Sequence, residues 1–191
     1  MSSQINILIG TTGSVASIKL SELVLNLKQN PRVNVKVVPT KASSFFFKEK
    51  DIDAQIHTDE EEWAIWKKKT DPVLHIDLRN WADIMLIAPL DANTLAKIAN
   101  GLCDNLLTCI LRAWDIKKPV VVCPAMNTNM WNHPFTAQHL NILQDVLHFK
   151  VIPPISKLLA CGDLGIGAME EPGVIASTVM TILLDSQSDT K

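Results

Sequence analysis

The segment that decides the fold is Ile5-Asn6-Ile7-Leu8-Ile9-Gly10-Thr11-Thr12-Gly13-Ser14-Val15-Ala16, close to the amino terminus. Its opening residues are almost all apolar, and several are β-branched, which predicts a buried strand that ends at Gly10. A polar turn over residues 11–14 follows, and apolar residues then recur at helical spacing, which predicts a helix over residues 15–27. A buried strand that leads through a short turn into an amphipathic helix is the first half of a βαβ unit.

The alternation of strand and helix patterns continues along the chain. The acidic run Asp59-Glu60-Glu61-Glu62 predicts a helix that carries Lys67-Lys68-Lys69 in its last turn, because these charges suit the helix dipole. Strands alternating with helices imply a parallel sheet that is covered on both faces. We therefore predict an α/β fold, a single-domain Rossmann-like (flavodoxin-like) subunit over residues 1–191 with a polar tail from about residue 185. Further strands are predicted at 33–38, 84–88, 120–123 and 151–152, a strand or loop at 52–58, and helices at 41–48, 92–100, 105–114, 134–147 and 171–184.

The composition narrows the class of protein. The chain has 191 residues, of which 47% are hydrophobic and 20% charged, and its net charge of −2 argues against a nucleic-acid partner. The apolar runs of about five to seven residues are too short to span a bilayer, and no apolar signal segment follows Met1. The four cysteines show neither a CxxC pair nor zinc spacing, so no metal site and a cytoplasmic location are expected.

Polar turns follow four of the predicted strands. They are residues 11–14, Pro39-Thr40-Lys41, residues 89–94 and the run Pro124-Ala125-Met126-Asn127-Thr128-Asn129-Met130-Trp131. The last run is the most unusual, because amides and two thioethers stand where a turn would favour Gly, Ser or Asp. Open α/β sheets bind ligands at the carboxyl ends of their strands, so we expect the turns to share one ligand. A planar cofactor with a phosphate tail is one candidate.

Individual turn residues allow two interpretations. Ser14 stands where free backbone N–H groups would suit a phosphate, but it is equally suited to be an ordinary helix N-cap. Its turn is not a GxGxxG motif, which disfavours a standard nicotinamide site. Asp91 and Asn93 are suited to reading an imide edge or to capping the following helix, and capping is the better interpretation for Asp91 in isolation.

Two further residues carry reactive groups. His75 has an imidazole suited to proton transfer near neutral pH, although a lone histidine among apolar residues is more often structural. Cys161 is flanked by Gly162, Gly165 and Gly167. This pattern is typical of a mobile flap that closes over a ligand and presents a thiol to it, or of a flexible surface loop with an incidental cysteine.

Five blocks in this order resemble the homo-oligomeric flavin-containing cysteine decarboxylases, over roughly residues 5–184. The resemblance implies an FMN-binding subunit that forms a homotrimer with active sites at subunit contacts. It implies decarboxylation of 4′-phosphopantothenoylcysteine to 4′-phosphopantetheine in coenzyme A biosynthesis, through flavin oxidation to a thioaldehyde, CO2 loss and re-reduction of the enethiol. The blocks are Gly13–Ala16, Asp71–Leu78, Ala88–Leu95, Pro124–Trp131 and Ala160–Met169.

The resemblance also implies roles for single residues. By position, His75 matches the catalytic base, Asn127 the residue that holds the substrate carboxylate, and Cys161 the proton donor. Ala160 and Met169 fall in the substrate flap. The implied FMN contacts are Ser14, Val15, Ala16, Thr40, Lys41, Ala42, Phe46, Asp91, Ala92, Asn93, Thr94 and Ala125.

The chain departs from the family pattern at two positions. Ala96 stands where the family usually has Gly, and Leu158 stands where a basic residue often precedes the flap cysteine. The second departure affects the expected contact with the substrate phosphate, for which Lys157 is the candidate replacement.

Rival functions of the same fold remain open at this point. They are a regulatory phosphatase-inhibitor-type or mixed-trimer subunit, a flavin prenyltransferase and a flavodoxin-like electron carrier. The joint presence of His75, Asn127 and Cys161 favours a self-sufficient decarboxylase.

Overall fold

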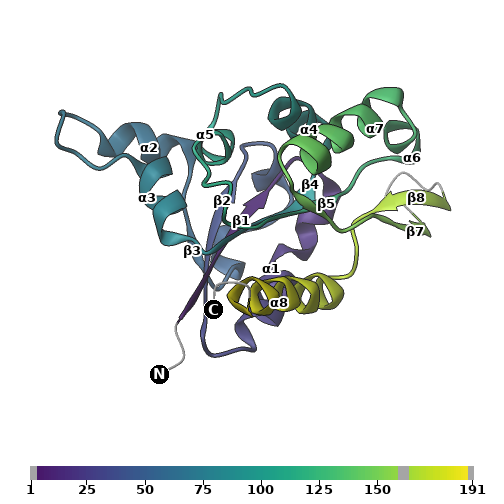
Figure 1. Cartoon of the computed structure of the whole chain (residues 1–191), viewed down its shortest axis with the longest axis horizontal. Coiled ribbons are helices and arrows are strands. Elements are labelled where there is room, and N and C mark those ends of the chain that lie inside the picture. The colour runs from purple at the N-terminus through teal and green to yellow at the C-terminus, as the bar shows by residue number, and fades with distance from the viewer. Residues whose placement is uncertain (1–3, 159–163, 189–191) are drawn as a thin grey trace.

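The computed structural model describes residues 4–158 and 164–188 (Figure 1). Its centre is a sheet of parallel strands in the order β3-β2-β1-β4-β5-β6. This is the 3-2-1-4-5-6 order of a Rossmann sheet, and without the two-residue β3 it becomes the 2-1-3-4-5 order of flavodoxin. The predicted fold class is therefore confirmed. The strands are β1 (Ile5–Thr11), β2 (Val33–Pro39), β3 (Gln55–Ile56), β4 (Ile84–Leu90), β5 (Val120–Pro124) and β6 (Lys150–Val151).

Helices cover both faces of this sheet (Figure 1). On one face lie α1 (Leu20–Lys28), which continues the 3₁₀ turn η1 (Val15–Lys19), and α8 (Pro172–Ser188). On the other lie α3 (Leu74–Trp81), α4 (Ala92–Ala99), α5 (Leu106–Arg112) and α7 (Pro134–Asn141), which continues as the π-helix η4 (Ile142–Val146). Within the described part of the chain, no helix has both the length and the apolar character that crossing a membrane requires.

The alternation of side chains along β1 feeds two separate cores. Ile7 and Ile9 pack with Leu23 of α1 and Val179 of α8, while Leu8 points into the core under α3, α4 and α5. All five side chains are fully buried. Burial of each such side chain contributes about 1.5–3 kcal/mol. A strand with both faces buried reads as a nearly continuous apolar run, which is the pattern that identified β1 in the sequence.

The prediction of a helix with a basic last turn is wrong at the carboxyl end of that helix. Helix α2 spans Asp59–Ile65, so the three lysines at 67–69 lie beyond it. The Asp71 carboxylate accepts hydrogen bonds from the backbone N–H groups of Lys67 (2.8 Å) and Lys68 (2.9 Å), which holds this segment in a turn. Helix α3 was not predicted, because its N-cap residue Val73 provides no side-chain capping bond and so no start signal.

Other boundaries also differ from those expected. Strand β4 runs through Pro89 to Leu90, where the sequence predicted an end at residue 88. Its pairing with β5 changes register between Ile87 and Leu90, and a proline is tolerated at such an irregularity. The predicted helix at 41–48 is reduced to the 3₁₀ turn η2 (Ser43–Phe45), which is followed by a second turn, η3 (Glu49–Asp51).

The glycine-rich region belongs in part to an antiparallel hairpin. Strands β7 (Ile155–Leu158) and β8 (Leu164–Ala168) pair with each other and lie beside α6 (Thr128–Trp131), to the right in Figure 1. The hairpin is tied to the loop after β5 because the N–H of Met126 donates to the carbonyl of Gly167 at 2.9 Å. Gly167 has φ +142, and a Cβ there would lie 2.1 Å from the Met126 carbonyl oxygen. Only glycine fits this contact without displacing the hairpin.

We expect Gly167→Ala to detach the hairpin from the loop after β5 and to lower the free energy of unfolding. Gly101→Ala is the matched control, because Gly101 also has a positive φ (+70) but a Cβ there would meet nothing within 4 Å. The control isolates the backbone cost of a left-handed residue, about 1–2 kcal/mol. Urea unfolding of both variants measures the difference, and equal losses would contradict a constraint at Met126.

Candidate functional site

A buried hydroxyl joins the turns after β1 and β4. The side chain of Thr12 donates to the carbonyl of Pro89 (2.8 Å) and accepts from the backbone N–H of Asp91 (2.7 Å). Because β1 and β4 are the neighbours at which the strand order reverses, this bridge lies at the topological switch point of the sheet. Open α/β sheets bind their ligands there. Nothing in the sequence singles out Thr12 except its place within this turn.

The turn after β2 closes the same edge from the other side. The backbone N–H of Thr40 donates to the Thr11 carbonyl at 2.9 Å. A Cβ built on Gly13 would lie 2.8 Å from the Ala42 Cβ and 3.0 Å from a carboxylate oxygen of Asp91. The loops that follow β1, β2 and β4 therefore converge on Gly13. Three of the four predicted polar turns meet there, and the fourth joins through a bond from the Ala125 N–H to the Leu90 carbonyl.

Capping accounts for part of the chemistry of these turns. Asp91 is the N-cap of α4, where its Oδ1 accepts from the N–H of Thr94 at 2.7 Å. Ser14 is the N-cap of η1 and accepts from the N–H of Ala16 at 3.4 Å. Asn93 is exposed and Ala92 is half-buried in the first turn of α4. For Ser14 and Asp91 the capping interpretation holds, and it leaves their remaining polar atoms at the same edge of the sheet.

Thr40 carries a polar atom that nothing in the described chain satisfies. Its Oγ1 is buried and has no hydrogen-bond partner. Burying a hydroxyl without a partner costs about 1–3 kcal/mol, so such an atom at a ligand-binding edge indicates a missing acceptor or donor. Of the other predicted residues on this loop, Lys41 and Ala42 are exposed and Phe46 is half-buried. These side chains are accessible to a ligand that lies over the turn.

A cavity of about 330 Å³ brings cofactor and substrate residues together. Its walls include Ser14, Val15 and Ala16 from the turn after β1, together with Asn127 from the loop after β5. Both strands of the hairpin close another side, and the adjoining Met169 also lines the cavity. Ala160 and Cys161, which were predicted to belong to the flap and to donate a proton, lie outside the described residues.

Two lysines of the cavity wall share one carboxylate. The carboxylate of Glu171 accepts from Lys19 (2.7 Å) and from Lys157 (2.9 Å). These contacts, that with Lys19 first, lower the pKa of Glu171 to about 2. The pairs connect η1, the hairpin and the start of α8. They also hold two cations at the cavity.

His75 lies at the start of α3, away from this cavity. Its Nδ1 contacts the carboxylate of Glu62 in α2 at 2.5 Å. Figure 1 shows α2 and α3 at the left of the molecule, whereas α6 and the hairpin lie at the right. One chain therefore does not bring His75 to Asn127. Glu62 was read only as part of an acidic first turn, and no sequence signal linked it to His75.

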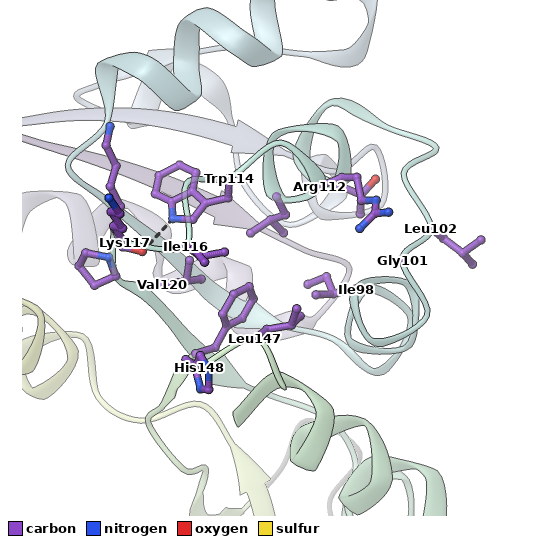
Figure 2. A pocket seen from close by; sticks show the side chains of 15 residues that line it. Ile98, Gly101, Leu102, Arg112, Trp114, Ile116, Lys117, Val120, Leu147 and His148 are labelled. Atoms are coloured by element: carbon purple, nitrogen blue, oxygen red, sulfur yellow. Dashed lines mark hydrogen bonds between the residues drawn. The ribbon is translucent and has the colours of Figure 1, made fainter. Parts of the chain in front are cut away.

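A second cavity, of about 260 Å³, lies at the opposite edge of the sheet (Figure 2). It surrounds Val120 at the start of β5 and is lined by Ile98, Trp114 and Leu147. The Trp114 indole N–H donates to the Lys118 carbonyl at 3.0 Å, which closes one wall. None of the predicted site residues in the described ranges lines it.

Comparisons with known proteins identify the family of the chain. Residues 1–184 match a family described as Flavoprotein. Phosphopantothenoylcysteine decarboxylase of Mus musculus is 52% identical over 177 residues, which are 93% of this chain and 86% of the relative. A probable phosphopantothenoylcysteine decarboxylase of Arabidopsis thaliana is 58% identical over 175 residues, 91% of this chain and 86% of that protein. The chain belongs to the flavoprotein family, within its group of phosphopantothenoylcysteine decarboxylases.

Solved structures of similar proteins have the same fold as this chain. A cysteine-to-serine variant of PPC decarboxylase, complexed with pantothenoylaminoethenethiol, aligns with a TM-score of 0.90 and 52% identity, over 94% of this chain and 98% of that one. The FMN-binding protein AtHal3 aligns with a TM-score of 0.86 and 53% identity, over 94% and 96%. The predicted family resemblance is confirmed.

We expect Glu171→Gln to lower stability at neutral pH and not in strong acid. A carboxyl whose pKa is lowered in the folded state stabilises the protein fully when the pH is above its ordinary pKa of 4.5. This contribution is lost as the pH falls towards the folded-state pKa of about 2. Since the side chain is 45% exposed, the difference at neutral pH is at most about 1 kcal/mol. Urea unfolding of the wild type and variant at several pH values measures this difference. A constant difference across this range would contradict the assignment.

Proposed function

We propose that this chain decarboxylates 4′-phosphopantothenoylcysteine to 4′-phosphopantetheine and CO2 with FMN as its cofactor. The observation that carries the proposal is the shared cavity. It joins the predicted cofactor residues Ser14, Val15 and Ala16 to the predicted substrate residues Asn127 and Met169. The family to which the chain belongs supports a flavin cofactor, and the names of its relatives support a decarboxylase activity. The cavity offers adjoining positions to the cofactor and the substrate.

The carboxyl edge of the sheet fits an FMN molecule. Ala42 and the Asp91 carboxylate lie close to Gly13. The unpartnered Thr40 hydroxyl and the exposed Asn93 lie on the same turns as these two residues, and so do the remaining predicted contacts. When bound, FMN supplies the two-electron oxidation that turns the CH2–SH group of the substrate into a thioaldehyde. The thioaldehyde provides the electron sink that loss of CO2 requires.

Asn127 holds the carboxylate that is lost. Its side-chain oxygen accepts from the Asn129 N–H at 2.8 Å, which orients the amide. The amide NH2 group then donates a neutral hydrogen bond to the substrate carboxylate. A cationic side chain would stabilise the charged ground state more strongly, and catalysis gains only from contacts that favour the transition state.

His75 and Cys161 are the proton-transfer groups of the proposal. His75 takes the substrate thiol proton so that the sulfur reacts as a thiolate. Cys161 donates the proton that completes the saturated thiol product, when the two electrons removed in the oxidation are returned to the enethiol as a hydride. The solved relative that carries serine in place of a cysteine holds an ethenethiol compound, which supports the role of a thiol in this last step.

The substrate phosphate has two candidate partners in the cavity wall. Lys19 and Lys157 both line the cavity, and Glu171 holds their ammonium groups. We assign the phosphate to this pair, because Leu158 cannot contribute the charge that the family often places at its position. Either lysine keeps its cationic head at the surface while its stem packs along the wall.

A homotrimer with shared active sites would bring the separated groups together. His75 of one subunit would then complete the cavity of its neighbour. Exposed apolar side chains flank both halves: Ile18 beside the cavity is 60% exposed, and Trp63 on α2 is 79% exposed. Exposed apolar residues at two different places on each subunit suit a heterologous contact that closes into a ring.

Anaerobic addition of 4′-phosphopantothenoylcysteine to the FMN-loaded protein tests the function, with mass analysis of the products. The wild type is expected to give 4′-phosphopantetheine. Cys161→Ser is expected to release CO2 but to accumulate the oxidised enethiol, because the last protonation lacks its donor. A normal yield of 4′-phosphopantetheine from this variant would contradict the role of Cys161.

The same assay separates the regulatory alternative. Bound flavin without turnover in the wild type would favour a regulatory or mixed-trimer subunit over the decarboxylase. A colourless preparation would require reconstitution with FMN before the assay, because the cofactor can dissociate during purification.

We expect Thr40→Val to weaken FMN binding while leaving the apoprotein as stable as the wild type or more so. The substitution removes an unsatisfied buried hydroxyl, which has no partner to lose until the ligand binds. Fluorescence titration should show a Kd raised about fivefold to tenfold, equivalent to about 1 kcal/mol. Thr108→Val is the control, because the Thr108 hydroxyl completes the capping box of α5 by accepting from the Asn105 N–H, so its loss should affect stability alone. Unchanged FMN affinity in Thr40→Val would contradict the contact.

A further inference from the structure

The acidic residues at the start of α2 have separate structural partners. Thr58 caps the helix by accepting from the Glu61 N–H, and Asp59 Oδ1 accepts from the Leu106 N–H at 2.7 Å, which ties α2 to the start of α5. Glu61 contacts His57 at 2.9 Å. Glu62 alone of these carboxylates contacts His75. The run is therefore more than a charged surface turn, because each contact fixes the helix or a neighbouring ring.

The contact between Glu62 and His75 is short and shielded. The Glu62 side chain is only 11% exposed, and its Oε1 lies 2.5 Å from Nδ1 of His75. No other hydrogen bond of the His75 ring occurs within residues 4–158 and 164–188. Burial raises the pKa of the neighbouring Cys109 thiol to about 11, and the charge of Glu62 adds to this shift. The thiol thus stays neutral beside the carboxylate and does not compete with it for the imidazole.

An ionised carboxylate can only accept a hydrogen bond, and this determines which nitrogen of the imidazole carries the proton. Nδ1 must be protonated to donate to Glu62, so Nε2 of the neutral ring is left with a lone pair. A histidine that lacks such a partner favours the opposite tautomer in water, with its proton on Nε2. The carboxylate also holds the ring in one orientation and stabilises the imidazolium that forms when the base takes a proton.

We infer that Glu62 is a positioning residue for His75, which holds the imidazole with Nδ1 protonated and Nε2 free to accept the substrate proton. This inference rests on the proposed function for the identity of the base. It adds to the site a residue from α2, whereas His75 lies in α3. Glu62 does not line the cavity and is not expected to touch substrate or flavin, so it acts through His75.

Three measurements on the FMN-loaded protein test the inference, with Glu62→Gln as the variant and Glu61→Gln as the matched control. The glutamine is isosteric but can donate as well as accept, so it no longer enforces one tautomer. Nitrogen-15 NMR of labelled histidine reports the protonated ring nitrogen, and the His75 signals are assigned by their loss in His75→Asn. Steady-state kinetics separate kcat from KM, and the flavin absorption spectrum reports cofactor occupancy.

In the wild type we expect His75 to be protonated at Nδ1, and in Glu62→Gln we expect a mixture that includes the Nε2 tautomer. Turnover of the variant should fall about 10- to 100-fold in kcat, with KM and flavin occupancy close to wild type, as for loss of a residue that orients a reactive histidine. Glu61→Gln should retain both the tautomer and kcat, because Glu61 contacts His57.

An unchanged tautomer in Glu62→Gln overturns the inference, whether or not kcat falls. An unchanged kcat in a wild type that is active overturns it as well. If the wild type does not decarboxylate, the proposed function fails, and the NMR result alone then decides whether Glu62 sets the protonation of His75.

Discussion

The hydroxyl of Thr12 is the interaction on which the candidate site depends. It is fully buried, and it donates to the Pro89 carbonyl while accepting from the Asp91 N–H, so both of its roles are satisfied across the switch point of the sheet. A buried polar group that is fully paired makes a rigid connection, because every alternative arrangement would leave it unpaired. The turns after β1 and β4 are thereby held in one relative position. The cap at Asp91 and the close approach at Gly13 both build on that position.

A second constraint sets the other wall of the cavity. Gly167 lies against the backbone of Met126 without a side chain between them, and this places the hairpin beside the Asn127 turn. Glu171 then connects the hairpin to η1 through Lys157 and Lys19. The cavity is therefore enclosed by segments that are distant in sequence. Backbone contacts and ion pairs connect these segments, in addition to the apolar core that Ala125 and Met169 join.

The catalytic groups that we propose differ in how far the sequence revealed them. The turns at 11–14, 39–41, 89–94 and 124–131 were predictable because each follows an apolar strand, and parallel strands end at one edge. Glu62 was not predictable, since its partner His75 lies in a helix that lacks a capping signal and was not foreseen. The hairpin was also missed, because its strands have only four and five residues and the glycines of the second strand are typical of a loop.

The sequence by itself determined the α/β class, the two-faced burial of the sheet and the edge at which polar turns gather. These features follow from local periodicity, which reports how each segment partitions between water and the core. Only the tertiary structure decided which polar atoms meet. Thr12 joins β1 to β4, Thr40 is left unpartnered, and Glu62 reaches His75 across two helices. Hydrogen bonds extend over about 3 Å and have strict angles, so such pairs depend on how the elements pack rather than on any pattern within one of them.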